Sequence, residues 1–310
     1  MPSHKKILFI TNGLRDERDA LRELYDLLGD VSVDLTILAA TPMIPGTITE
    51  YVVDFDAQVI DRLKTTYDSV LPSGSSTSPV ACEVIHADQP FLGIMQKILV
   101  EDYDAVVKAA EPTNRGSGYA ALDMSLLRKC PRPVWLLRNN GQPDADSPGQ
   151  ILAAVDPVFA ETNARLLSIA LLREADLIAS RQSATLRIVA CWTSALGEAR
   201  HNPFLNIKDE DIERDSNDIR EQHLKALSIL IEESGVKSPY EIVQLKGDPA
   251  SAIPAYTRKV GSRVLVMGTV ARTGIPGFIM GNTAENILHE LSCSIVAIKP
   301  PGFVCPINIK

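Results

Sequence analysis

The stretch that decides the fold occurs twice, as Ile7-Leu8-Phe9-Ile10-Thr11-Asn12 and as Ile151-Leu152-Ala153-Ala154-Val155-Asp156. Four further pairs of similar segments follow in the same order along the two halves of the chain. Their first members lie at residues 35–39, 88–90, 104–108 and 133–138, and their second members at 187–191, 247–249, 263–267 and 294–299. Because the order is kept throughout, the pattern predicts an internal duplication. The offset between the copies grows along the chain, so the second copy carries insertions, chiefly before residue 247.

The matched segments are short apolar runs rich in Val, Ile and Leu, as in strands that are covered on both faces of a parallel sheet. Stretches with apolar residues at helical spacing separate them, at residues 16–28, 52–71, 91–101 and 119–128 in the first copy and 161–180, 209–233, 250–260 and 283–291 in the second. This alternation predicts βαβ units. We therefore expect an α/β protein of two tandem doubly wound domains, each a five-stranded parallel sheet flanked by helices.

A segment rich in Asn, Gly, Pro and Asp separates the copies and has the composition of a linker. We expect a first domain over residues 1–139, a linker over 140–149, a second domain over 150–300 and a tail over 301–310. Hydrophobic residues make up 45% of the 310 residues, which is enough for two cores of roughly 150 residues each. The last strands of the two copies would be sheet edges, and the linker would let them pair with each other. Further dimerisation stays open.

The composition argues against several classes of protein. A formal net charge of −8, with no basic run longer than Arg128-Lys129, disfavours nucleic-acid binding. No stretch approaches the ~20 apolar residues of a membrane span, and the apolar run after Lys6 is too short for a signal peptide, so we expect a cytoplasmic protein. The five cysteines are scattered and form no CxxC pair, which supports neither a zinc site nor a disulfide framework. His289-Glu290 lacks the second histidine of a zinc protease motif.

Two features of the second copy point to the carboxyl ends of its strands, where open α/β sheets bind ligands. Its first strand ends at Asp156, which presents a carboxylate. Its fourth strand ends at Gly268 and leads into a glycine-bearing stretch, which reaches a helix start near Thr283. Glycines let a backbone approach a phosphate closely, and a helix start offers free N–H groups and a positive dipole end.

The stretch from Gly268 onward resembles the nucleotide loop of the universal stress protein family, Gly-x-x-Gly-x9-Gly-Ser/Thr. Gly268 and Gly281 match this pattern, while Ala271 stands in place of the second glycine and Asn282 in place of Ser or Thr. The Asp156 segment and residues 246–249 also match, and the likeness extends from Lys6 to Pro300. The resemblance implies a stress-response binding protein that supports survival under stress, including DNA damage. It implies no catalytic residue, no required cofactor and no metal, with ATP or AMP as the nucleotide that could bind.

This resemblance identifies a set of candidate nucleotide-binding residues: Asp156, Gly268, Ala271, Arg272, Gly274, Gly281, Asn282 and Thr283. Two of them depart from the pattern in a way that matters. The Cβ of Ala271 is costly if that position needs a positive φ. Asn282 is followed three residues later by Glu285, the spacing of a helix cap, and one side chain cannot serve both jobs fully. Asp156 has a plain alternative as a solvated carboxylate at a strand end, and Arg272 as a solvated loop cation.

The first copy departs further from the pattern. Asn12 stands where Asp156 stands in the second copy, and the segment after its fourth strand, residues 109–118, is shorter and lacks the glycine spacing. Glu111 in that segment would repel phosphate. We expect no ATP in this half.

Two other functions remain open. An ATP-hydrolysing or adenylating enzyme would need a Ser-Gly-Gly loop after the first strand, which neither Asn12-Gly13-Leu14 nor Asp156-Pro157-Val158 provides. A binder of an apolar or lipid-like ligand is suggested by the exposed-looking run Phe278-Ile279-Met280, which could equally pack onto its own domain. His201 and His223 are expected in polar insertions.

Overall fold

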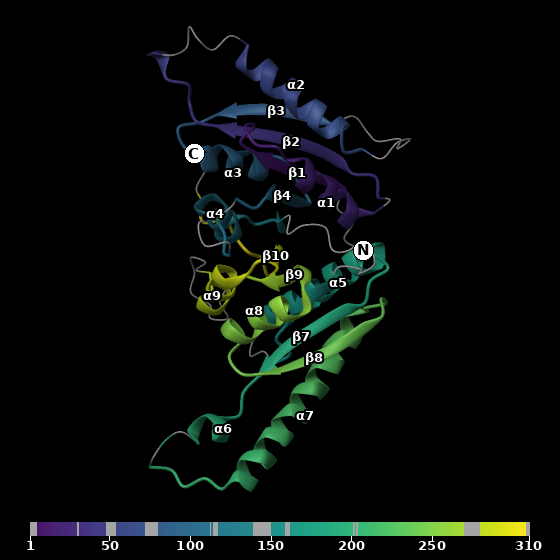
Figure 1. The fold of residues 1–310 in the computed structure, drawn as a ribbon, viewed down its shortest axis with the longest axis vertical. Coiled ribbons are helices and arrows are strands. Elements are labelled where there is room, and N and C mark those ends of the chain that lie inside the picture. Colours follow the sequence, from purple (N-terminus) through teal and green to yellow (C-terminus); the bar gives the residue numbers. More distant parts are fainter. Residues whose placement is uncertain are drawn as a thin grey trace.

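The computed structural model describes residues 5–29, 31–47, 54–71, 80–111, 113, 117–138, 150–158, 162–200, 202, 204–269 and 280–307. Helices and strands alternate along both halves (Figure 1). In chain order the elements are β1 (Lys6–Thr11), α1 (Arg18–Leu28), β2 (Asp34–Thr41), α2 (Phe55–Asp68), β3 (Ala81–His86), α3 (Pro90–Val100), β4 (Ala105–Ala109), α4 (Ala121–Lys129), β5 (Val134–Leu137), β6 (Gln150–Ala154), α5 (Thr162–Arg181), β7 (Leu186–Trp192), α6 (Ala195–Ala199), α7 (Asp209–Ser234), β8 (Tyr240–Lys246), α8 (Pro249–Val260), β9 (Ser262–Gly268), α9 (Asn282–Glu290) and β10 (Ser294–Ile298).

The strands form one sheet in the order β3-β2-β1-β4-β5-β10-β9-β6-β7-β8, which Figure 1 shows stacked along the long axis of the molecule. Within each set of five the pairs are parallel. Strand order reverses beside the first strand of each set, as in a doubly wound fold. The predicted fold class is confirmed. We call the first five strands with their helices the first module and the last five with theirs the second module.

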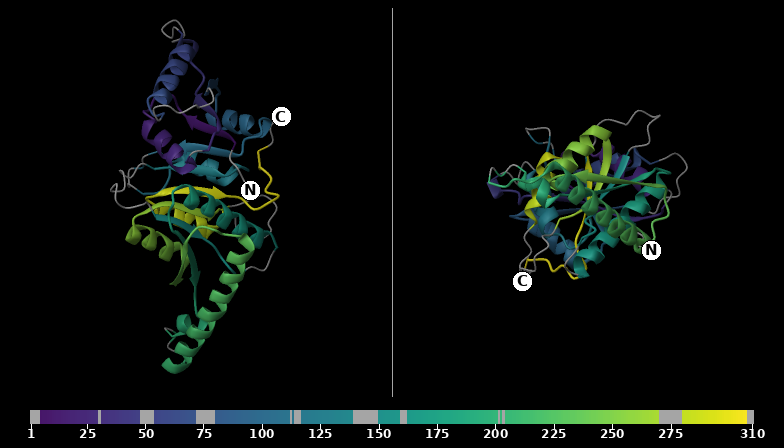
Figure 2. Two further views of the ribbon diagram at one scale, coloured as in Figure 1. Left: turned by 90° about the vertical axis from the view of Figure 1, so that its right-hand side faces the viewer. Right: turned by 90° about the horizontal axis from the view of Figure 1, so that it is seen from below.

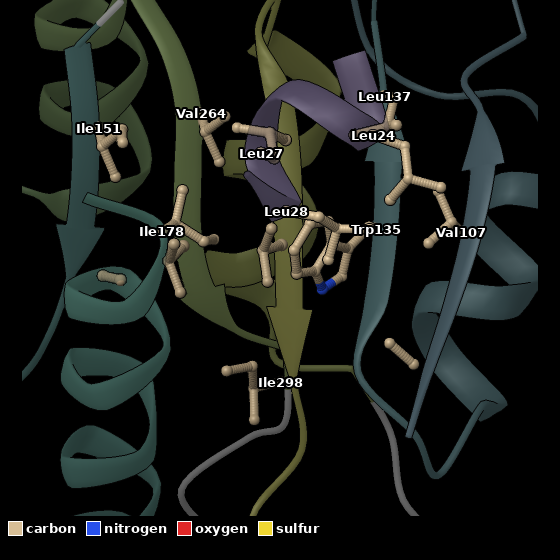
Figure 3. Packing of buried hydrophobic residues seen from close by; sticks show 14 of the residues in the cluster. Leu24, Leu27, Leu28, Val107, Trp135, Leu137, Ile151, Ile178, Val264 and Ile298 are labelled. Atoms are coloured by element: carbon tan, nitrogen blue, oxygen red, sulfur yellow. The ribbon is translucent and has the colours of Figure 1, made fainter. Parts of the chain in front are cut away.

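The two modules meet at β5 and β10, which pair antiparallel with Trp135 opposite Val296. The predicted pairing of the last strands is therefore present in the structure. Trp135 is almost fully buried at this junction. Figure 3 shows it beside Leu24 and Leu28 of α1 and between strands of both modules. If β5 and β10 were exposed sheet edges, each would offer unpaired N–H and C=O groups. Their pairing satisfies these groups on both strands.

The helices divide between the two faces of the sheet. Apolar residues of α1, α2, α5 and α7 gather in one buried cluster and those of α3, α4, α8 and α9 in another, and each cluster draws on strands of both modules. Alternate residues of one strand serve opposite faces, as with Phe9 and Leu8, because successive strand side chains point to opposite sides. The buried clusters pass from one module into the other because the sheet is continuous across the junction. The exact domain boundaries at 139 and 150 stay a prediction.

All eight predicted helices are present, with ends within a few residues of the predicted ranges. The paired segments at 88–90 and 247–249 are not strands but the starts of α3 and α8, because each ends in a proline, Pro90 and Pro249, at the first helical position. The sequence pattern missed the short helix α6. This helix packs against the N-terminal part of α7 (Figure 2), which extends beyond the sheet.

Equivalent basic residues follow β5 and β10 and tie each module to the other. Arg138 donates hydrogen bonds to the carbonyl oxygens of Gly118 and Leu291, and its guanidinium lies 4.8 Å from the ring centre of Tyr119. Lys299 donates to the carbonyl oxygen of Leu127 and to the Thr269 hydroxyl. Each side chain thus donates to a carbonyl of the opposite module, which fixes the two halves relative to each other.

Two ionisable groups are buried at opposite ends of β10. The Glu23 carboxyl accepts a hydrogen bond from Ser294 Oγ at 2.7 Å, and burial raises the pKa of Glu23 to about 7. Burial lowers the pKa of Lys299 to about 7. Both groups therefore resist carrying a charge, and they should link the stability of the junction to pH.

The free energy of unfolding should fall as the pH rises from about 4.5 to about 7, because the native protein holds the Glu23 proton more tightly than the unfolded chain does. It should rise again between about 7 and 10.5, because native Lys299 binds its proton less tightly than the unfolded chain does. Glu23→Gln should reduce the fall in unfolding free energy between about pH 4.5 and 7, by up to about 3 kcal/mol. Lys299→Met should reduce the rise in unfolding free energy between about pH 7 and 10.5. Urea unfolding across this pH range measures both, with the exposed Lys225→Met as control. Unchanged slopes in both variants would contradict this assignment.

Candidate functional site

The carboxyl ends of β6 and β9 form the candidate site of the second module. These strands are neighbours, with Ala154 opposite Met267, so Asp156 and Gly268 end at the same edge of the sheet. Strand order reverses here, since β7 follows β6 on one side and β10 follows β9 on the other. This is the position at which open α/β sheets bind their ligands.

Asp156 is partly exposed and lies two residues after the end of β6. Its Oδ1 accepts a hydrogen bond from the backbone N–H of Val158 at 3.0 Å, and its carbonyl oxygen accepts one from Ser168 Oγ of α5 at 3.2 Å. These contacts hold the residue in place after the strand ends. A carboxylate oriented in this way can accept hydrogen bonds from hydroxyl groups of a ligand.

Gly268 packs closely against α5. A Cβ at this position would lie 2.8 Å from Cδ2 of Leu167 in α5, so Leu167 would have to shift for any other residue. The family glycine at this position thus lets α5 approach the end of β9. Such a close approach is one of the ordinary reasons for glycine beside a ligand site.

Gly281 and Asn282 lie where α9 begins. Gly281 is the N-cap residue, Asn282 is the first helical residue, and no side chain caps the helix. The backbone N–H of Gly281 donates to the carbonyl oxygen of Thr269 at 3.3 Å, so the residues on either side of the glycine-bearing stretch meet. The alternative of Asn282 as a cap paired with Glu285 is wrong, because Gly281 holds the N-cap position. Glu285 forms an ion pair with Arg128 of α4.

The structure brings Asp156, Gly268, Gly281, Asn282 and Thr283 to the second module's carboxyl edge, and Asn282 and Thr283 are exposed there. Ala271, Arg272 and Gly274 lie outside the described residues. So do Phe278 and Ile279 of the apolar run, whereas Met280 is buried in the core cluster that contains α8 and α9.

His223 lies in a polar stretch of the chain, as expected, but its side chain is buried between α7 and the sheet. Its Nδ1 lies 3.2 Å from Nε2 of Gln244 in β8. Burial lowers the pKa of His223, an effect that the carboxylate of Asp156 opposes. His201 lies outside the described residues.

The equivalent edge of the first module is filled by its own charged side chains. Lys108 at the end of β4 is buried, and its Nζ lies 2.9 Å from Oδ1 of Asp123 and 3.1 Å from Oε1 of Glu111. Burial raises the pKa of Asp123, which Lys108 counteracts. A cavity of about 30 Å³ remains, lined by Thr11, Asn12, Arg15, Glu17, Ala40, Ile94, Lys108, Ala109, Glu111 and Leu122. That volume accommodates water but no nucleotide.

The sequence pattern did not identify Lys108 and Asp123 as a buried ion pair, although it contained a signal for one. Lys108 interrupts an otherwise apolar strand, and a lysine in a buried strand needs a carboxylate partner. The position equivalent to Lys108 in the duplication is Met267 in the second module. The two modules thus differ at this strand position, which carries a buried, ion-paired lysine in the first module and a methionine in the second.

A larger hollow of about 500 Å³ lies away from both edges, between α6 and α7. It is open and lined by Leu196, Asn206, Ile207, Asp211, Arg214, Asp215 and Asp218. Among the residues that the structure describes, no group of three or more His, Cys, Asp or Glu side chains could hold a metal ion. The duplicated strand ends therefore remain the better candidates for a site.

Asp123→Ala should destabilise the protein by about 3–5 kcal/mol, because it leaves the buried ammonium of Lys108 without its closest carboxylate. The double variant Lys108→Met/Asp123→Asn should recover part of this loss. Chemical denaturation measures the change, and Asp102→Ala is the matched control because Asp102 pairs with Arg132 at the surface. A loss below about 1 kcal/mol in Asp123→Ala would show that the buried pair does not hold the first module closed.

Comparison with known proteins also finds similarity to the universal stress protein family. The model of the universal stress protein family matches residues 149–299. Universal stress protein E of Photorhabdus laumondii is 25% identical and aligns over 99% of both chains. Universal stress protein E of Escherichia coli K12 is 29% identical over 74% of this chain and 72% of that protein.

Solved structures agree on the fold. A protein of unknown function from Pseudomonas aeruginosa superposes with a TM-score of 0.70 at 23% identity, covering 96% of this chain and 94% of that one. A universal stress protein from Archaeoglobus fulgidus gives a TM-score of 0.63 at 14% identity over 96% and 98% of the two chains. In the described part of the chain, no helix is both long enough and apolar enough to cross a membrane.

Proposed function

We propose that the chain, with its two modules in tandem and its similarity to universal stress proteins, is a stress-response protein that works by binding, with an adenine nucleotide held by the second module alone. ATP or AMP would lie at the carboxyl edge of β6 and β9. Asp156 would accept hydrogen bonds from the nucleoside, and the start of α9 at Asn282 and Thr283 would face the phosphates. Ala271, Arg272 and Gly274 complete the proposed site from the sequence pattern alone.

The observation that carries this proposal is the contrast between the two edges. In the first module Lys108, Glu111 and Asp123 bind one another where a ligand would lie. In the second module Met267 replaces the lysine, while α9, like α4 of the first module, begins without a side-chain cap. An uncapped helix start has N–H groups available for an anion.

Binding is a better account than turnover for this site. The residues after β1 and β6 supply no Ser-Gly-Gly loop, and Asp156 is the single carboxylate that the proposal assigns to the nucleotide. An apolar ligand is less well supported, because Met280 of the apolar run is buried in the core. We place the protein in the cytoplasm, with a small molecule rather than nucleic acid as its ligand. The β5–β10 pairing supports a unit complete within one chain, and a homodimer would use other surfaces.

ATP or AMP should raise the thermal stability of the protein. A ligand at 100 times its dissociation constant adds about 2.7 kcal/mol. Asp156→Ala should abolish the shift, because it removes the carboxylate that would bind the nucleoside. Asn12→Ala, at the equivalent position of the first module, should leave the shift intact. Thermal unfolding with ATP, AMP and no ligand measures these differences.

A flat response of the unmodified protein to both nucleotides would refute nucleotide binding. A shift lost equally in Asn12→Ala and Asp156→Ala would place the site elsewhere. Sustained release of phosphate from ATP by the pure protein would instead favour the enzyme.

A further inference from the structure

The antiparallel junction brings the first module's α4 to the candidate site of the second module. Strands of the two modules run in opposite directions across the β5–β10 pair. Because α4 runs back along its own sheet, its last turn lies at the edge where β6 and β9 end. The contacts of this turn agree, since Thr269 Oγ1, directly after β9, donates to the carbonyl oxygen of Leu127 at 3.3 Å.

This contact anchors the start of the glycine-bearing stretch to the first module. Thr269 is fully buried, and Lys299 donates hydrogen bonds both to its hydroxyl and to the Leu127 carbonyl. The N–H of Gly281 donates to the Thr269 carbonyl oxygen. Hydrogen bonds therefore connect the end of β9 and the start of α9 with the C-terminal turn of α4.

An ion pair crosses the same boundary one residue further along α4. Arg128, in the last turn of α4, pairs with Glu285, in the first turn of α9. Both side chains are partly exposed, at 40% and 31%. Glu285 also has His289 nearby, with 3.9 Å between His289 Nε2 and Glu285 Oε1. Arg128 is thus the cation that the first module supplies to this carboxylate.

The charge of Glu285 matters because of where it stands. A carboxylate in the first turn of a helix stabilises the helix, yet it also repels a second anion at that helix start. With Arg128 beside it, the pair is close to neutral, and the N–H groups and dipole of α9 remain available to a phosphate. Without Arg128 the start of α9 would carry an uncompensated negative charge.

We propose that Arg128 of the first module determines the charge preference of the second module's site, by neutralising Glu285 so that phosphate-bearing nucleotides bind in preference to the uncharged nucleoside. The inference rests on the proposed nucleotide binding and adds a role for the first module, which takes no nucleotide of its own. Arg128 acts here as a positioning and specificity residue that need not touch the ligand.

The test compares ATP, AMP and adenosine by isothermal titration calorimetry, at two salt concentrations, in the full chain. Arg128→Gln should weaken ATP binding about tenfold, weaken AMP binding less, and leave adenosine within about twofold. Adding Glu285→Gln to Arg128→Gln should restore ATP binding to within about threefold, because the repelling charge is then gone as well. Arg132→Gln is the matched control, since Arg132 follows the same helix and pairs with Asp102, and it should change none of the three affinities.

An equal loss for all three ligands in Arg128→Gln would assign Arg128 a structural role and overturn the inference. So would a double variant that stays as weak as Arg128→Gln. Equal ATP binding by the unmodified protein and Arg128→Gln would overturn this inference while leaving nucleotide binding intact. If the unmodified protein binds none of the three, the proposed function itself fails, and this inference fails with it.

Discussion

The antiparallel pairing of β5 with β10 is the interaction on which the rest of the architecture depends. It joins two five-stranded sheets into one, and it buries Trp135 beside α1 of the first module. Because the two edges satisfy each other's backbone groups, neither module exposes a long strand at the junction. The two hydrophobic clusters follow from the same pairing, since each lies on one face of the joined sheet and passes from one module into the other.

The two modules are alike in fold and share this pairing, yet they differ in detail. Each module ends in a basic residue, Arg138 or Lys299, that donates to a carbonyl of its neighbour. Their carboxyl edges, in contrast, differ. Lys108 and Asp123 close the first edge with an ion pair that is costly to bury and costly to break. The second edge has Met267 in place of the lysine and a partly exposed carboxylate at Asp156.

Much of the fold could be predicted from the sequence because its strands are buried on both faces and so read as apolar runs. The runs at Ile7 and Ile151 establish the duplication directly, and the helices between them follow from their spacing. The site was harder, because its features depend on residues that are distant in sequence. Asn282 and Glu285 have the spacing of a cap, but Glu285 pairs with Arg128, which lies 157 residues away in the sequence. His223 lies in a polar stretch, and only the packing of α7 on the sheet buries it.

Covalent linkage of the two modules has a consequence for how such a protein can change over time. In a symmetric dimer of identical chains, every substitution appears at both ends of the shared interface at once. Here Arg138 and Lys299 occupy equivalent places but are different residues, and each could be altered without altering the other. The tandem arrangement thus frees one half to lose its pocket and become a fixed scaffold, while the other half stays under separate selection.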